Sequence, residues 1–114
     1  MNIGFFRIAI CFVSLGSTGA ALATEHYPTV AIVEYVGGCM KANGETRAAL
    51  NSCSCSIDVI ASIIPYDRYE AAETFRSMGL ETGERGVLFR QGAAAKNAFS
   101  ELRRAQAEAD VRCF

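Results

Sequence analysis

The residues of this chain best suited to chemistry are its five cysteines, at positions 11, 39, 53, 55 and 113. Cys11 lies in an apolar run near the start of the chain, and the other four follow that run. Thiolates bind soft metals such as copper(I) and zinc, and closely spaced thiols can exchange disulfides. An even number of cysteines in an exported chain predicts structural disulfides instead. The chemistry of the cysteines therefore depends on whether the chain is exported.

The first residues have the pattern of an export signal. Arg7 precedes the apolar run from Ile8 to Leu15, and Ala21-Leu22-Ala23 follows after a stretch of small residues. This order is typical of a secretory signal peptide, and the apolar run is shorter than the about 20 residues that a membrane span needs. The sequence thus predicts cleavage after Ala23, no stable membrane anchor afterwards, and one periplasmic or secreted domain over residues 24–114.

The charges of the chain are nearly balanced. Eleven Lys and Arg residues stand against 12 Asp and Glu residues. Nucleic acids and anionic membrane surfaces attract proteins with a strong excess of basic residues. The sequence therefore predicts neither kind of partner.

The neighbours of the cysteines favour disulfides over metal or redox chemistry. Cys53 and Cys55 are flanked by serines and Asp58, without the positive charge that lowers the pKa of a reactive thiol. The only histidine is His26, and the chain has no Cys-x-x-Cys pair. We predict two structural disulfides among Cys39, Cys53, Cys55 and Cys113, with no bound metal or cofactor. The alternative is a metal or thiol-redox carrier that uses Cys53 and Cys55.

Apolar residues recur three and four positions apart through most of the mature chain, which predicts an all-α fold. We expect a small disulfide-stapled bundle of about four helices. An Asp67 to Glu70 capping box is expected to open the third helix, and Gly37-Gly38 is expected to allow close approach of a neighbour to the first. The polar segment 80–92 is expected to be a surface loop. The predicted helices are Thr29–Ala42, Glu45–Ile64, Asp67 to Gly79, and Ala93–Arg112.

A hairpin of the first two helices would constrain how the cysteines pair. If the chain turns at Asn43-Gly44, Cys39 lies near the turn, and Cys53 lies nearer to it than Cys55, which is about 3 Å further along the helix axis. This favours Cys39–Cys53 with Cys55–Cys113. The pairing Cys39–Cys55 with Cys53–Cys113 is nearly as good.

Few other residues suggest a functional site. Arg85 and Arg90, near Phe89, form a candidate patch for binding a protein partner, although Arg90 could equally cap a helix end. No Gly-x-Ser-x-Gly nucleophile motif is present, and His26 lies near the expected mature N-terminus, where end residues are commonly solvated. We therefore expect a binding protein and not an enzyme, with a partner surface around Gly79 to Arg90 and on the charged last helix.

Several short segments also carry a likeness to other proteins. They are Cys39-Met40, Leu50, Cys53 to Asp58, Tyr66 to Tyr69, Phe89-Arg90 and Arg112-Cys113. In these the chain resembles a group of small exported proteobacterial proteins found beside quinoprotein (PQQ-dependent) alcohol dehydrogenases and their c-type cytochromes. The resemblance implies an accessory protein of periplasmic alcohol oxidation, such as a chaperone, docking factor or carrier. The chain has no Cys-x-x-Cys-His haem motif, so we do not expect it to be the cytochrome.

Overall fold

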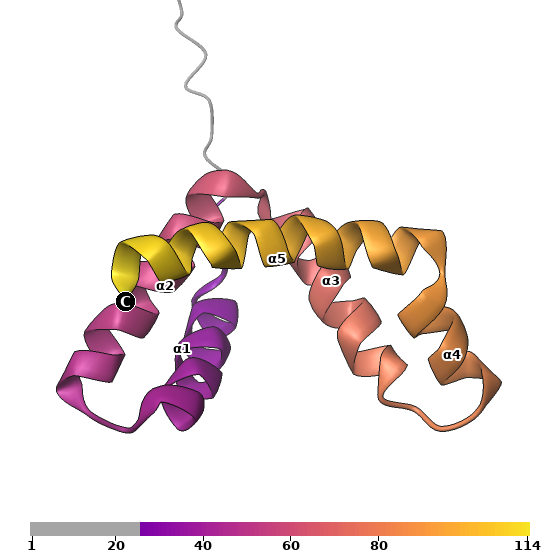
Figure 1. Ribbon diagram of the computed structural model, residues 1–114, viewed down its shortest axis with the longest axis horizontal. Helices are drawn as coiled ribbons and strands as arrows, with labels where there is room; N and C mark the ends of the chain where they lie inside the picture. The colour runs from indigo at the N-terminus through magenta and orange to yellow at the C-terminus, as the bar shows by residue number, and fades with distance from the viewer. Residues whose placement is uncertain (1–25) are drawn as a thin grey trace, which may run out of the picture.

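The computed structural model describes residues 26–114, and the expected signal peptide, residues 1–23, lies outside this part. Over the described residues the fold is all-helical, as predicted, with five helices and no strand. Figure 1 shows the helices arranged as an arch, in which two helical hairpins hang from one long helix. The helices are α1 (Thr29–Asn43), α2 (Arg47–Ile63), α3 (Tyr66–Gly79), α4 (Glu84–Gln91) and α5 (Ala93–Cys113).

The hairpin of α1 and α2 turns at Gly44, whose positive φ of 100° suits a residue without a Cβ. Thr46 then caps α2, because its side-chain oxygen accepts a hydrogen bond from the backbone N–H of Ala49 at 3.1 Å. Helix α1 runs unbroken through Gly37 and Gly38, and a Cβ added at either glycine would meet no atom within 4 Å. The expected close approach of a neighbour at these glycines is therefore wrong.

The expected start of α3 is also wrong, by one residue. Pro65 is the N-cap, Tyr66 is the first helical residue, and no side chain caps this end, so Asp67 does not form a capping box. Pro65 disfavours a helical conformation in the residue before it, so α2 ends there. Its own backbone is extended, and α3 begins at the next residue. Asp67 lies in the first turn instead, where its negative charge is favourable near the helix N-terminus.

Segment 80–92 is mostly helix α4 and not the expected loop. Gly83, with φ 89°, precedes the helix and accepts a hydrogen bond from the backbone N–H of Val87. Val87, Leu88 and Phe89 are consecutive, so the segment has no helical spacing of apolar residues to reveal it. Contacts with α3 and α5 stabilise this short helix. The sequence pattern alone does not indicate that a helix forms here.

Helix α5 crosses both hairpins and buries one stripe against them (Figure 1). The stripe has mainly small side chains, which allow the helices to approach closely. Across the outer edge, Arg68 of α3 and Glu101 of α5 form an ion pair at 2.7 Å. The buried residues of α5 are Ala95, Ala98, Leu102, Ala105 and Ala109.

The core lies where α2, α3 and the first described residues meet under α5. Tyr27 is almost fully buried, donates a hydrogen bond to the backbone oxygen of Ile64 at 3.0 Å, and lies against the rings of Tyr66 and Tyr69. Burial raises the pKa of the Tyr27 and Tyr69 phenols well above the usual value of a tyrosine. Cys53, Ile57 and Ile60 of α2 and its C-cap residue Ile64 recur three and four positions apart, and all four are buried.

Two disulfides tie α1 and the end of α5 to α2. Cys39 pairs with Cys53 between α1 and α2, and Cys55 pairs with Cys113 between α2 and the end of α5. The Cα atoms are 5.8 Å and 5.7 Å apart. This is the pairing that the hairpin argument favours. Two intramolecular disulfides are consistent with an oxidising compartment.

No single helix in residues 26–114 has the length and apolar character to cross a membrane. Helices α2 and α3 reach that length and composition only when taken together, and they meet at a bend of 114°.

Candidate partner-binding surface

The three residues nominated for partner binding all lie on α4, but they have different environments. The Arg90 guanidinium donates a hydrogen bond to the backbone oxygen of Gly79 and lies 3.5 Å from that of Glu81. These carbonyls belong to the end of α3 and the turn after it, where helix carbonyls lack partners. Arg90 therefore has the helix-capping contact that the sequence left open as an alternative.

Phe89 faces inward. Its ring lies 6.4 Å from that of Phe75, centre to centre, and its side chain is partly buried. Aromatic pairs at this separation contribute to holding helices together. Phe89 thus joins α4 to α3, and little of its ring is available to another protein.

Arg85 is exposed, and exposed apolar side chains lie on the same hairpin. Leu80 is 78% exposed, Leu88 is 69% exposed and Val87 is 42% exposed. Arg85 and Leu88 are three residues apart, so they lie on the same side of α4. We call Leu80, Arg85, Val87 and Leu88 the α3–α4 tip. An arginine among exposed apolar side chains is a combination that protein interfaces favour.

A tight backbone contact fixes the shape of the α3–α4 tip. Gly86 is buried, and a Cβ added there would lie 1.9 Å from the backbone oxygen of Glu81. We expect Gly86→Ala to destabilise the hairpin by about 1 to 3 kcal/mol, because backbone and not a flexible side chain must move. Amide hydrogen exchange of α4 would measure the loss.

Gly37→Ala is the matched control for Gly86→Ala. A Cβ at Gly37 meets nothing within 4 Å, so alanine should stabilise α1 by up to about 1 kcal/mol. Unchanged exchange of α4 in the Gly86→Ala variant would contradict the contact.

The cysteines do not form a shared site. Cys53 and Cys55 point to different neighbours and each is bonded to another cysteine, so neither offers a thiolate in this state. Within residues 26–114 no three His, Cys, Asp or Glu side chains are grouped so that they could hold a metal ion. His26 is exposed at the start of the described chain.

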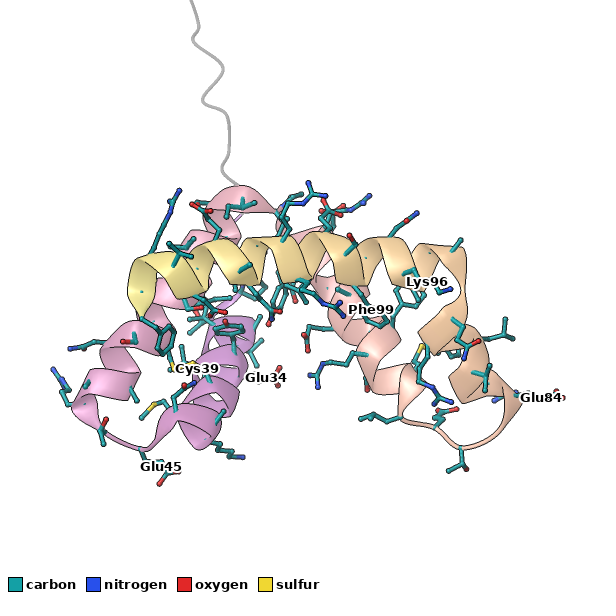
Figure 2. All side chains as sticks on the ribbon, in the orientation of Figure 1. Glu34, Cys39, Glu45, Glu84, Lys96 and Phe99 are labelled. Carbon is teal, nitrogen blue, oxygen red and sulfur yellow. A yellow bond between two sulfur atoms is a disulfide. The ribbon has the colours of Figure 1, made fainter. Side chains whose placement is uncertain are left out.

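Sequence reasoning missed a broad hollow under α5. It has a volume of about 1400 Å³ and is lined by one side each of α1, α3 and α5. In Figure 2, Glu34 of α1 and Phe99 of α5 point toward it, whereas Glu45 and Glu84 lie at the far ends of the two hairpins. We call this hollow the arch groove. The one signal for it in the sequence is Gly38, a helix-interior glycine that lines the groove.

Comparison of the chain with protein-family models, curated proteins and solved structures gives no match.

Proposed function

We propose that this protein is an exported, non-enzymatic accessory protein that binds a periplasmic protein partner through the α3–α4 tip. The observation that carries the proposal is the exposure of Leu88, one helical turn from Arg85, and of Leu80 on the same hairpin, whose shape is fixed by Gly86. Exposed leucines gain free energy when a partner covers them, and arginine is frequent among the residues that dominate binding energy. Partner binding would use both properties.

The partner that we propose is a quinoprotein alcohol dehydrogenase or its c-type cytochrome. The support is the resemblance of the cysteine framework and flanking residues to exported proteins found beside such enzymes. The α3–α4 tip also limits the chemistry of the partner surface. The exposed Arg85 would pair with a carboxylate on the partner, and the leucines would pack on an apolar patch next to it. The role is docking or chaperoning, and it requires no catalytic group on this chain.

The alternative function, a metal or thiol-redox carrier, needs Cys53 and Cys55 as free thiols. Both are in disulfides with different partners, and Cys53 is fully buried. No observation favours the carrier over the binding protein. Intact mass of the mature protein, with and without thiol alkylation, tests it: free thiols or bound metal in the protein purified from the periplasm would support the carrier.

The binding proposal is tested with purified proteins. The oxidised mature protein is titrated against the quinoprotein alcohol dehydrogenase and, separately, against the c-type cytochrome of the same organism. We expect Arg85→Ala and Leu88→Ser each to weaken binding by about 5- to 30-fold, which corresponds to about 1 to 2 kcal/mol. Both side chains are exposed, so neither change should affect folding.

Arg104→Ala and Val111→Ser are the matched controls, because both residues are exposed on α5 and lie outside the α3–α4 tip. They should bind like the unmodified protein. Equal binding by all four variants, or binding to neither enzyme nor cytochrome, would discard the proposal. Arg90→Ala is unsuitable because it also removes the contact at the end of α3.

A further inference from the structure

We infer that the arch groove is a second binding site, which takes a basic amphipathic helix of another protein. The site is separate from the α3–α4 tip and uses other residues, so it does not depend on the function proposed above. Two features of the groove carry the inference: its size and the charges that line it. A glycine on its wall, Gly38, leaves room for an approaching helix.

The size of the groove suits a helix. A helix with its side chains is about 10 Å across and rises about 1.5 Å per residue, so a volume of about 1400 Å³ matches roughly three turns. Sites for small molecules are usually about 300 to 1,000 Å³ and enclose most of the ligand. The groove is larger, and its lining comes from α1 of one hairpin, α3 of the other, and α5. A secondary-structure element of a partner fills such a space better than a metabolite.

The groove walls have the alternation of apolar and polar side chains that an amphipathic helix would match. On α1, Ala31, Tyr35 and Gly38 fall on one side, and on α5 Phe99 and Leu102 do so. The phenol of Tyr35 is held by a hydrogen bond of 2.8 Å to the buried Ser56. These side chains provide a partly apolar floor for the apolar stripe of the incoming helix.

The charges of the groove favour a basic partner. Its lining contains four carboxylates, Glu34, Glu70, Glu73 and Asp110, and two guanidinium groups. Arg76 is paired with Glu73 at 2.6 Å. Among residues 26–114 no ion pair occupies Glu34, Glu70 or Asp110, which leaves three carboxylates against Arg103. Lys or Arg side chains on the two edges of an incoming helix would pair with them.

Gly38 leaves room on the groove wall for such a helix. A glycine in a helix interior costs about 1 kcal/mol relative to alanine. Neighbours within the molecule do not require it, since a Cβ there would meet nothing within 4 Å. Glycine also serves where the backbone must be approached closely by a ligand. A helix lying in the groove would make that approach to α1 at Gly38.

The test uses two adjacent glycines of α1. Gly38→Arg places a long, positively charged side chain in the groove, whereas Gly37→Arg places the same side chain outside its lining. Both positions have open space for a Cβ, and arginine is a better helix former than glycine, so both variants should fold at least as well as the unmodified protein.

The probe is a fluorescently labelled synthetic peptide of about 14 residues, with Leu spaced three and four apart and Lys elsewhere. Its binding is measured by fluorescence anisotropy. We expect it to bind the oxidised mature protein, and Gly38→Arg to weaken binding by about tenfold or more, against less than about twofold for Gly37→Arg. A twin peptide with Glu in place of Lys should not bind. Arg85→Ala should leave peptide binding unchanged, which separates this site from the α3–α4 tip.

Three results would overturn the inference. The first is equal peptide binding by the two arginine variants, and the second is equal binding of the acidic twin. The third is self-association that Gly38→Arg abolishes in analytical ultracentrifugation, because the groove would then hold a second copy of this chain.

Discussion

Replacement of Cys55 and Cys113 by alanine is expected to lower the free energy of unfolding by about 4 kcal/mol. The disulfide closes a loop with a sequence separation of 58. In the chain-entropy model, a disulfide that closes a loop of this length restricts the unfolded chain and stabilises the folded state by about 4 kcal/mol. This is a large part of the free energy of unfolding of a typical protein, about 5 to 15 kcal/mol. The melting temperature should fall by about 15 to 30 °C in a domain of this size, measured by circular dichroism.

The single variants Cys55→Ala and Cys113→Ala serve as the control. Each alone breaks the same bond, so each should cost nearly as much as the pair when the remaining thiol is alkylated. Effects of two residues that act as one unit are not additive. An unchanged melting temperature for the double variant would show that this bond does not stabilise the fold.

Truncation of one buried side chain, in Tyr27→Ala, is expected to have an effect of similar size. Tyr27 is 2% exposed and joins the chain before α1 to Tyr66, Tyr69 and the backbone oxygen of Ile64. Loss of a buried aromatic ring typically costs about 3 to 5 kcal/mol. Urea unfolding followed by tyrosine fluorescence and circular dichroism would measure the change.

Tyr27→Phe separates the ring from the hydroxyl. It keeps the ring and removes only the hydrogen bond to Ile64, so the expected loss is about 1 kcal/mol. If phenylalanine cost as much as alanine, the hydroxyl and not the ring would be the important group. If alanine cost nothing, the residues before α1 would not be part of the core.

The sequence predicts well those features that depend on helical spacing over several turns. Most of the apolar residues of α2 and α5 that recur three and four positions apart are buried, because this spacing puts them on one face over four turns or more. The favoured disulfide pairing follows from the same geometry, since a short turn at Gly44 fixes the register of α1 against α2.

The features that the sequence pattern does not predict depend on contacts between segments. Helix α4 has only eight residues, and its three adjacent apolar residues follow no helical period. Its position depends on Gly86 against the Glu81 carbonyl and on Arg90 at the end of α3. These contacts connect residues that no pattern along the chain relates.

The sequence nominates Arg85, Phe89 and Arg90 together, and all three lie on α4. Only the structure separates the exposed Arg85 from Phe89 and Arg90, which contact α3. The arch groove could not be predicted, because it forms between helices that are distant in sequence. The sequence predicts a contact within the molecule at Gly38, whereas a Cβ at this residue would face open space.

The most direct test of partner binding by the α3–α4 tip is amide hydrogen exchange of the oxidised mature protein, alone and with the quinoprotein alcohol dehydrogenase or its cytochrome. We predict slower exchange in residues 78–90 in the presence of the partner, and no change in the hairpin around the Cys39–Cys53 disulfide. A complex in which residues 78–90 exchange as fast as in the free protein would contradict the account.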